Sequence, residues 1–356
     1  MSKKIRVAVF GIVHPHVNML SKAILAYPDD FEMIGFAEYP NPTKDVVQYE
    51  KRRGMLCELG MKEYSYEELL EEKPDFALVL SDNGSREELC CMLLSRGIHV
   101  MDEKPMTPTL EGSLRVMRTA KENGAMMLTN WPIAWLATFR KAKELLDAGR
   151  IGKLMRVTYR SPATWGPFSF PLEEHLKKSW WYNPECGGGS MLDYACYGTV
   201  LATLMFGKGA KRVSAIKKNF GVTDVGVEDY SAMMLDFGDG VGLLEGSWST
   251  YNPGEIPTGP ILYGTEGVIV CDRYSNEVKI YEGRTHKPQP PVEIITCSEE
   301  AQANYLGAHL ASVFKGECQP DIMLSPEINV AVVAALDAGA KSAATGEFVE
   351  CGNIEY

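Results

Sequence analysis

The sequence lacks the features that would place it in several other classes of protein. No apolar run approaches the ~20 residues that a membrane-spanning helix needs, so we expect no transmembrane segment. An excess of basic residues is also missing: the formal net charge is -11, which argues against a nucleic-acid partner and against binding to an anionic membrane surface. Internal repeats and low-complexity tracts are absent.

The cysteines form none of the arrangements that bind zinc or build a disulfide framework. There are nine, with one adjacent pair (Cys90 and Cys91) and no CxxC motif, a pattern that favours a reducing compartment. The first residues, MSKKIRVAVFGIV, resemble a signal peptide only superficially, because Arg6 interrupts the apolar run and no small-residue cleavage site follows. We therefore expect a cytoplasmic protein whose first strand is this segment.

The six histidines do not predict a metal site. His14 and His16 lie two residues apart, but Pro15 between them disrupts regular structure. No third ligand follows at a spacing diagnostic of zinc. The sequence thus predicts no bound metal.

The patterns that are present indicate an α/β protein of two domains. Its 356 residues exceed the ~250–300 at which single hydrophobic cores stop growing. In the first third, apolar runs such as IRVAVF and DFALVL alternate with helical patterns, which predicts βαβ units and a parallel sheet. From about residue 131, a helical segment (137–149) precedes runs in which apolar and polar residues alternate, as in antiparallel strands with one covered face.

The turn after the first predicted strand resembles a dinucleotide-binding turn only in part. It reads Gly11-Ile12-Val13-His14-Pro15-His16. The fingerprint needs GxGxxG, and only its first glycine is present. Val13 has a Cβ where the backbone should approach a pyrophosphate, and His16 replaces the glycine that lets the helix pack on the strand. Either the phosphate lies slightly farther out, held by helix N-terminal amides and a histidine, or no dinucleotide binds.

Glu38 favours the first alternative. It ends the second apolar run after Gly11, where an acidic side chain accepts hydrogen bonds from the adenine-ribose hydroxyls. A carboxylate there repels a 2′-phosphate, so NAD is predicted over NADP. The competing interpretation is a solvated carboxylate in a loop.

The run GIHVMDEKPMTP predicts a strand that carries Lys104 to a ligand-binding edge. Glu103 precedes the lysine, and Pro105 ends the strand because proline cannot continue a central strand. Ligands of open α/β sheets bind at the carboxyl ends of the strands. The alternative is a surface lysine in a strand-to-helix loop, since lysines are mostly exposed.

A second group of polar residues follows three glycines in GGGSMLDYACYGTVLATLMFG (187–207). The glycines give a flexible entry, and the apolar run that follows them and ends at Gly207 has the length of a helix. On that helix Asp193 and Tyr197, four residues apart, would share one face. Beside Lys104, the positive charge would bring the pKa of the Tyr197 phenol nearer to neutrality, which makes the tyrosine a candidate proton donor. The alternative is an ordinary packed aromatic residue.

The stretch between residues 161 and 182 is rich in aromatic residues and proline. Trp165 and Trp181 are candidates for a substrate wall, because aromatic faces stack on sugar or aromatic rings. A loop packed on its own side chains is the equal alternative. Arg160, at the end of a predicted strand, is a candidate partner for a substrate carboxylate.

The EKP run and the GGGxxxDxxxY pattern together are specific, and with them the chain resembles the Gfo/Idh/MocA family of glucose-fructose oxidoreductase and inositol dehydrogenase. The resemblance extends over nearly the whole chain. Further matching positions are the first strand and its turn, Ser81, Asn83, Asn130, AKELLDAGRIGKL, Trp180–Glu185, GTEG and TGEFVE.

The resemblance implies the fold. We expect an N-terminal Rossmann domain with a doubly wound parallel sheet (1–130) and an α/β domain with a large, open, mostly antiparallel sheet (131–325). A C-terminal helix and tail (326–356) would return to the first domain. The open sheet would serve oligomer contacts, in a homodimer or homotetramer.

The resemblance also implies the chemistry. The protein is expected to be an NAD-dependent dehydrogenase or reductase that moves hydride between nicotinamide and a secondary alcohol or carbonyl of a sugar, cyclitol or related polyhydroxylated compound. Lys104 would bind the nicotinamide ribose and polarise the substrate oxygen, Tyr197 would exchange its proton, and Asp193 would hold substrate or tyrosine. The predicted cofactor-binding residues are Gly11, Ile12, Val13, His14, His16, Glu38, Ser81, Asn83, Glu103 and Lys104, and the predicted substrate residues are Arg160, Trp165 and Trp181.

The chain departs from the family pattern at several positions. Most members have a histidine as the acid/base at position 197, whereas the glucose-fructose oxidoreductase and dihydrodiol dehydrogenase branches have a tyrosine. Arg86 stands where a histidine is usual, and Pro132 lies near the place of an arginine in many relatives. With the incomplete glycine turn, these departures leave a second class open, a non-catalytic ligand-sensing or scaffolding member with weak cofactor binding. A lyase or hydrolase that uses NAD transiently is a third.

Overall fold

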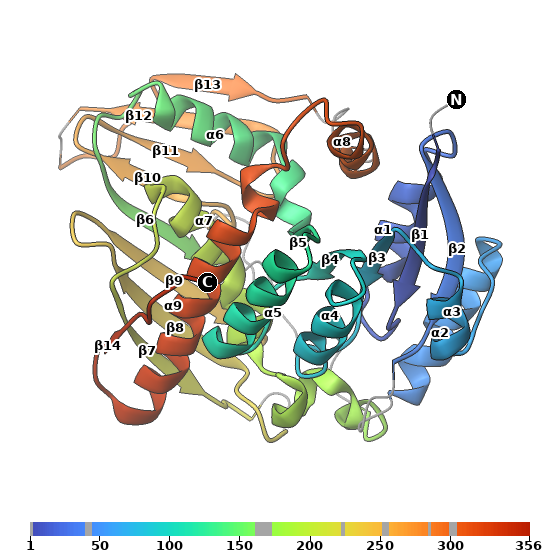
Figure 1. Cartoon of the computed structure of the whole chain (residues 1–356). Helices are drawn as coiled ribbons and strands as arrows, with labels where there is room; N and C mark the ends of the chain where they lie inside the picture. Colours follow the sequence, from blue (N-terminus) through green and yellow to red (C-terminus); the bar gives the residue numbers. More distant parts are fainter. Residues whose placement is uncertain are drawn as a thin grey trace.

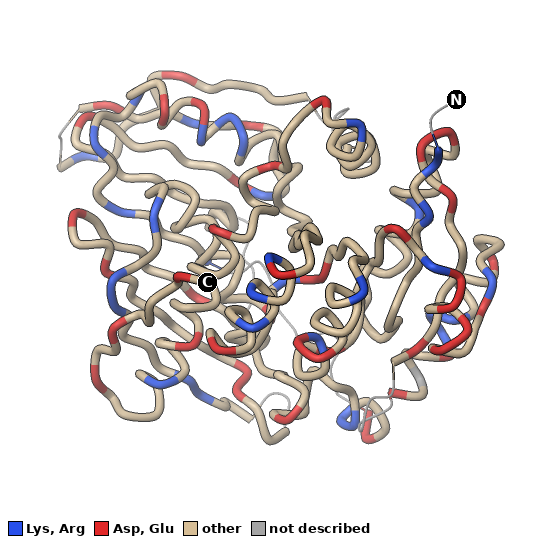
Figure 2. The backbone as a smooth tube through the Cα atoms, in the orientation of Figure 1, with Lys and Arg blue, Asp and Glu red and all other residues tan. Residues whose placement is uncertain are grey.

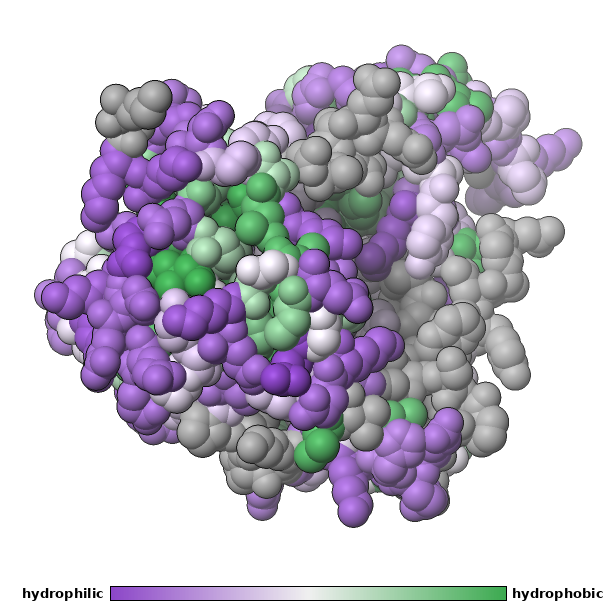
Figure 3. Space-filling model, turned by 90° about the vertical axis from the view of Figure 1, so that its right-hand side faces the viewer, coloured by the Kyte–Doolittle hydropathy of each residue, from purple (hydrophilic) through white to green (hydrophobic). Residues whose placement is uncertain are grey.

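The computed structural model describes residues 3–39, 45–160, 173–221, 225–250, 256–283, 286–298 and 305–356. Within these residues the chain forms two sheets with helices packed around them (Figure 1). No helix in these segments is both long and apolar enough to cross a bilayer. Basic and acidic positions are interleaved along the chain (Figure 2), and polar side chains occupy most of the face seen in Figure 3.

The first sheet is parallel throughout, in the order β2-β1-β3-β4-β5. Its strands are β1 (Ile5–Phe10), β2 (Phe31–Ala37), β3 (Phe76–Val79), β4 (His99–Glu103) and β5 (Met127–Asn130). Its helices are α1 (Val17–Leu25), α2 (Val46–Glu58), α3 (Tyr66–Glu71), α4 (Arg86–Leu94) and α5 (Leu110–Glu122). The strand order reverses between β1 and β3, where doubly wound sheets bind ligands.

The strands of this sheet are apolar on both faces because helices cover both. In β1, Val7 and Val9 join the core cluster that contains α1 and α2, while Ala8 and Phe10 join the cluster that contains α4 and α5. Near-continuous apolar strands are typical of a parallel sheet covered in this way. The predicted parallel α/β domain is therefore confirmed.

Within the described residues the second sheet has nine strands, in the order β13-β12-β11-β10-β6-β9-β8-β7-β14. All neighbours are antiparallel except β6 and β9. The strands are β6 (Leu154–Arg160), β7 (Arg212–Lys218), β8 (Tyr230–Asp236), β9 (Val241–Ser247), β10 (Ile261–Gly264), β11 (Gly267–Cys271), β12 (Glu277–Glu282), β13 (Glu293–Thr296) and β14 (Val349–Glu350). The predicted large, mostly antiparallel sheet is confirmed.

In the described residues four helices follow β5, and all but the third of them pack on one face of this sheet. They are α6 (Ala137–Asp147), α7 (Cys196–Phe206), α8 (Tyr305–Phe314) and α9 (Pro326–Thr345), with short turns at η1 (Pro132–Trp135), η2 (Leu176–Lys178), η3 (Trp180–Tyr182), η4 (Pro184–Cys186) and η7 (Ile322–Leu324), and a π-helix, η5 (Met191–Ala195). α6 packs on β11 and β12, and α7 packs on β6 and β9, whereas α8 lies against α1.

The C-terminal helix α9 joins the two halves of the molecule. It packs against α5 and β5 on one side and against α7 and β7 on the other (Figure 1). After α9 the chain adds β14 to β7 at the edge of the second sheet. The end of the chain therefore contacts both sheets, because the apolar residues of α9 lie on more than one of its faces.

The other face of the second sheet has an apolar surface. Ile216 in β7, Met234 in β8 and Leu243 in β9 are 51%, 40% and 36% exposed. Met234 pairs directly with Leu243 across the two strands. We call these three residues the open-face patch.

Candidate active site

Lys104 follows β4 directly and is buried against the second domain. Its Nζ donates to the backbone oxygen of Asp193 at 2.6 Å and to Oδ1 of the same residue at 2.9 Å. The lysine is 4% exposed, and the peptide bond between Lys104 and Pro105 is cis. The structure thus brings together two of the predicted residues from different domains.

The triple glycine fixes this contact. Gly187 has φ +67°, and a Cβ there would lie 2.7 Å from the Cβ of Asn83. The two segments of the chain therefore approach each other too closely for a side chain at position 187. Asn83 Nδ2 donates to the Gly187 oxygen at 2.8 Å, and the Gly84 amide donates to the Cys186 oxygen at 3.0 Å. These bonds attach the segment before Asp193 to the end of β3.

Asp193 lies in the π-helix that precedes α7. Its Oδ2 accepts a hydrogen bond from Trp248 Nε1 at 3.1 Å, and its Oδ1 holds Lys104. Burial lowers the pKa of Lys104, but Asp193 and Tyr197 together raise it, so that the pKa lies well above the usual value. The lysine therefore stays charged, and Asp193 fixes its position.

Tyr197 faces this pair from the first turn of α7. Lys104 Nζ lies 4.6 Å from the centroid of its ring, Trp131 packs against the ring edge-on, and the side chain is buried. Burial raises the pKa of Tyr197 to about 12, although Lys104 and Arg273 lower it. The expectation that the cations would bring this pKa towards neutrality is wrong, because desolvation of the phenolate outweighs their attraction.

The turn after β1 uses most of its own amides. Gly11 has φ +76°, and a Cβ on it would lie 2.7 Å from the Ser81 amide nitrogen. The amides of Gly11, Ile12, His14 and His16 donate to Ala37, Glu38, Leu80 and the His14 ring respectively. Among residues 11–16, the Val13 amide has no hydrogen-bond partner in the described part of the chain. One backbone donor of the turn is thus available to a phosphate oxygen.

Glu38 directly follows β2 and reaches this turn. Its Oε2 accepts from the Ile12 amide at 3.0 Å and its Oε1 from the Tyr39 amide at 2.9 Å. A carboxylate oxygen can accept more than one hydrogen bond, so Glu38 can also accept from ribose hydroxyls. The carboxylate is held beside the turn and is not a freely solvated loop side chain.

Ser81, Asn83 and Glu103 lie at the ends of β3 and β4, on the same edge of the sheet. The three side chains are buried, and Asn83 Oδ1 has no hydrogen-bond partner within the described residues. A buried acceptor without a partner is costly and suits a ligand donor. With the free Val13 amide and Glu38, this edge fits a dinucleotide.

His14, His16 and Glu103 come together although their sequence spacing gave no sign of it. Their candidate ligand atoms all lie within 4.8 Å of one another. Glu103, however, accepts from His16 Nδ1 at 2.9 Å, from Asn130 Nδ2 at 2.5 Å and from the Lys104 amide at 3.1 Å. These hydrogen bonds account for the cluster without an ion, and the absence of a metal stays a prediction.

Arg86 stands where the family resemblance implies a histidine, and it connects the ends of β3 and β4 by hydrogen bonds. It is fully buried at the start of α4 and donates to the backbone oxygens of Glu103 at 2.7 Å and Ser81 at 3.2 Å, and also to that of Pro105. The sequence marked this position as a departure but gave no role for it. The structure shows that the guanidinium positions the segment that carries Lys104.

The structure describes two of the three predicted substrate residues, Arg160 and Trp181. Trp165 lies outside the described residues. Trp181 stacks on Trp180, which donates to the Val13 oxygen, and the Arg52 guanidinium lies 5.8 Å from the Trp181 ring. The turn η3 therefore places Trp181 near the turn that follows β1, and its role as a substrate residue stays a prediction.

Arg160 lies in β6, and its proposed contact with a substrate carboxylate stays a prediction. It follows Tyr159 in β6, and successive side chains of a strand point to opposite faces. Tyr159 enters the core beside α7, and Arg160 lies 3.9 Å from Glu245 of the neighbouring strand. The arginine that does face Tyr197 is Arg273, just after β11, with its Cζ 5.8 Å from the ring centroid. The sequence signal for it, an arginine at the end of the GVIVCD strand, was too weak to single it out.

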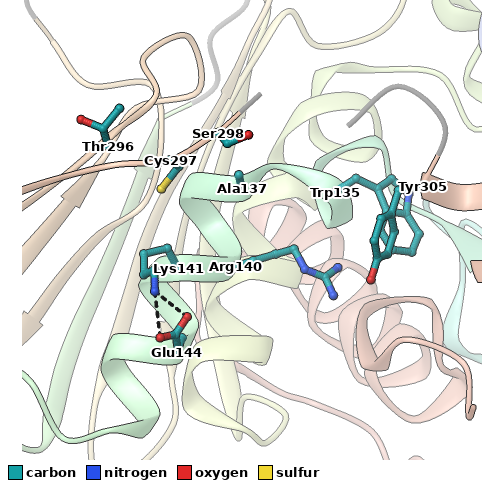
Figure 4. A pocket seen from close by; sticks show the side chains of 9 residues that line it. All are labelled: Trp135, Ala137, Arg140, Lys141, Glu144, Thr296, Cys297, Ser298 and Tyr305. Atoms are coloured by element: carbon teal, nitrogen blue, oxygen red, sulfur yellow. Dashed lines mark hydrogen bonds and ion pairs between the residues drawn. The ribbon is translucent and has the colours of Figure 1, made fainter. Parts of the chain in front are cut away.

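A separate cavity of about 540 Å³ lies at the start of α6 (Figure 4). Its lining includes Trp135, Arg140, Cys297 and Tyr305, and none of Lys104, Asp193 or Tyr197. In Figure 4 Arg140 extends towards the rings of Trp135 and Tyr305. This cavity is not part of the candidate active site.

Two family models match the chain. Residues 6–131 match the oxidoreductase family with an NAD-binding Rossmann fold, and residues 139–270 match the Gfo/Idh/MocA C-terminal domain. Fold and matches define an oxidoreductase built on a dinucleotide-binding domain. More narrowly, the chain belongs to the Gfo/Idh/MocA family.

Individual relatives agree with this assignment. The 1,5-anhydro-D-fructose reductase of Ensifer adhaerens is 27% identical over 82% of this chain and 84% of its own length. The NADP(+) scyllo-inositol 2-dehydrogenase of Bacillus subtilis is 24% identical over 64% of this chain and 67% of its own length. An NAD-binding protein from Listeria innocua has the same fold, with a TM-score of 0.74 and 22% identity over 98% of this chain and 97% of that one.

Proposed function

We propose that the protein is an NAD-dependent dehydrogenase or reductase of a sugar, cyclitol or related polyhydroxylated compound, with Lys104, Asp193 and Tyr197 as its active site. The observation that carries the proposal is the contact of Lys104 with both Asp193 and the Tyr197 ring. This contact lies at the edge of the first sheet where β3 and β4 end, which is the edge that fits a dinucleotide. A structural salt bridge alone does not require a buried tyrosine beside it.

The protein residues divide the work of proton transfer and orientation. When bound, the nicotinamide coenzyme accepts or donates the hydride. Two of the three N–H bonds of Lys104 point to Asp193, and the third is available to the substrate oxygen. Tyr197, neutral at physiological pH, donates its proton to that oxygen in the reductive direction and takes it back in the oxidative one.

Glu38 supports NAD over NADP. Its carboxylate is fixed at the end of β2 by two backbone amides. A 2′-phosphate would bring further negative charge close to it, and like charges at short range in a partly buried site repel strongly. The family includes NADP-dependent relatives, so membership of the family does not decide between the two coenzymes. The preference for NAD is therefore argued from Glu38 alone.

The open-face patch supports a homodimer or homotetramer. Ile216, Met234 and Leu243 form an apolar surface on three neighbouring strands towards the β14 edge of a wide sheet, and exposed apolar patches of this kind mark interaction sites. A second copy of the chain, presenting the same patch, would cover it symmetrically.

All nine cysteines are free thiols, which supports a reducing cytoplasmic location.

The first experiment is calorimetric titration of the purified protein with NAD, NADH, NADP and NADPH, followed by a search for polyol-dependent NADH formation. We expect NAD to bind more tightly than NADP and a sugar or cyclitol to reduce it. Failure of all four dinucleotides to bind a folded protein would support the non-catalytic alternative. Turnover of a substrate without net change of NAD would indicate a lyase or hydrolase.

A further inference from the structure

Arg273 brings an unbalanced positive charge to the active site. It follows β11, and its Cζ lies 5.8 Å from the centroid of the Tyr197 ring. The charge of Lys104 on the same ring is balanced by Asp193 at 2.9 Å. Arg273 has no carboxylate partner within the described residues, and the adjacent Asp272 accepts instead from the amides of Thr258 and Tyr274.

Tyr159 adds a second group without a partner. Its side chain is 1% exposed, and its ring packs against α7 at Gly198, where a Cβ would lie 3.0 Å from the tyrosine Cδ1. Its hydroxyl is buried and makes no hydrogen bond in the described part of the chain. After burial, which raises its pKa, the strongest influence on this phenol is the nearby Arg273, which lowers it. Arg273 thus lies by the ring of Tyr197, and the unpartnered Tyr159 packs on the next residue of α7, Gly198.

Other arginines in similar surroundings have a partner. Arg140 lies over the rings of Trp135 and Tyr305, but it also pairs with Asp321 at 3.2 Å. Arg212, on the exposed edge of β7, pairs with Asp236 at 2.8 Å. Burying part of a guanidinium without a neighbouring anion costs free energy. At Arg273 a bound ligand could supply that anion.

We propose that Arg273 and Tyr159 bind a carboxylate of the substrate, so that the substrates are sugar acids and other polyhydroxylated carboxylates. The inference rests on the proposed function and narrows its substrate class. A guanidinium binds a carboxylate through two parallel hydrogen bonds. One unbalanced positive charge matches a carboxylate, whereas a phosphate monoester carries about -1.5 to -2 at neutral pH.

The test is binding to the NAD-loaded protein, measured by calorimetry with matched pairs of compounds. The pairs are glucuronate with glucose and galacturonate with galactose, and glucose 6-phosphate is added as the phosphate probe. We expect each acid to bind at least about tenfold more tightly than its neutral partner, which corresponds to about 1.4 kcal/mol. Acids that bind no better than the neutral sugars overturn the proposal, and tighter binding of the phosphate ester overturns the choice of carboxylate.

Variants separate Arg273 from general effects. Arg273→Gln should reduce the ratio of acid to neutral-sugar affinity to about one, and calorimetry with NAD checks that the coenzyme still binds. Arg273→Lys, which keeps the charge but loses the fork, should retain part of the preference and covers the case in which the glutamine variant fails to fold. Arg212→Gln is the surface control. An undiminished preference for acids in both Arg273 variants contradicts the proposal.

The two proposals can fail separately. A protein that binds NAD and oxidises neutral polyols as well as acids retains the proposed function and loses this inference. If the wild-type protein does not bind NAD, the proposed function is rejected. In that case, binding of the acids to the coenzyme-free protein still tests whether Arg273 binds a carboxylate.

Discussion

At the scale of single residues, Tyr197 is the proposed proton donor, and its hydroxyl can be removed while its ring contacts are kept. Tyr197→Phe keeps the ring against Trp131 and Lys104. We expect kcat to fall by about 10²–10⁴-fold, the usual contribution of a general acid or base, with the dissociation constant for NAD unchanged. Steady-state NADH absorbance and calorimetry measure the two quantities. Wild-type turnover in the variant would exclude the proton-transfer role.

The pKa of Tyr197, about 12, determines how the rate should depend on pH. The tyrosine is protonated across the neutral range, so the rate of carbonyl reduction should stay level up to about pH 10. Alcohol oxidation needs the deprotonated form, and its rate should rise about tenfold per pH unit over the alkaline range. Initial rates in both directions test this. An oxidation rate that levels off near neutral pH would mean that another group accepts the proton.

Glu38 is expected to control coenzyme choice. Glu38→Gln keeps an acceptor for the Ile12 amide and removes the negative charge. The ratio of NAD to NADP affinity should fall by about tenfold or more, which corresponds to about 1.4 kcal/mol of lost repulsion. Glu32→Gln, an exposed residue of β2, is the control. An unchanged ratio would assign the preference to another residue.

At the scale of elements, the turn between β1 and α1 depends on Gly11. A methyl group at this position would meet the Ser81 backbone at 2.7 Å, in addition to the strain of φ +76°. Gly11→Ala should lower the free energy of unfolding by about 2–4 kcal/mol, because strained backbone alone costs about 1–3 kcal/mol. Gly60, with φ +79° and open space around it, is the matched control. In denaturant unfolding, equal losses for the two alanine variants would mean that the close approach to β3 is unimportant.

Elements also show where sequence patterns were sufficient. The alternation of apolar runs and helical segments predicted β1 to β4 in order, and the C-terminal helix expected within residues 326–356 is α9 (Pro326–Thr345). The helix expected between the three glycines and Gly207 instead begins with the π-helix Met191–Ala195. This π-helix is held by hydrogen bonds from Lys104 and Trp248 to Asp193. Such long-range contacts cannot be predicted from the local sequence.

At the scale of the whole molecule, the open-face patch should carry subunit contact. Met234→Glu places a charge beside Leu243, and burying an unpaired carboxylate is costly. The assembly should dissociate at least tenfold more readily, as measured by light scattering during gel filtration. Met19→Glu, at an exposed position of α1, is the control. A wild-type protein that is monomeric, or an unchanged assembly in the Met234 variant, would reject this interface.

The sequence by itself determined the fold class and indicated the residues that we propose for the reaction. Strand and helix periodicity is a local property, and Lys104, Asp193 and Tyr197 stood within patterns that mark strand ends and helix faces. The tertiary structure decided what depends on burial and on distant contacts. It gave Tyr197 a raised pKa where nearby charge alone predicted the opposite, and it placed Trp181 near the turn that follows β1 and Arg160 on the other face of β6. It also put Arg273 beside Tyr197 from 76 residues further along the chain. Desolvation and long-range contact are properties of the packed chain, so no reading of local pattern contains them.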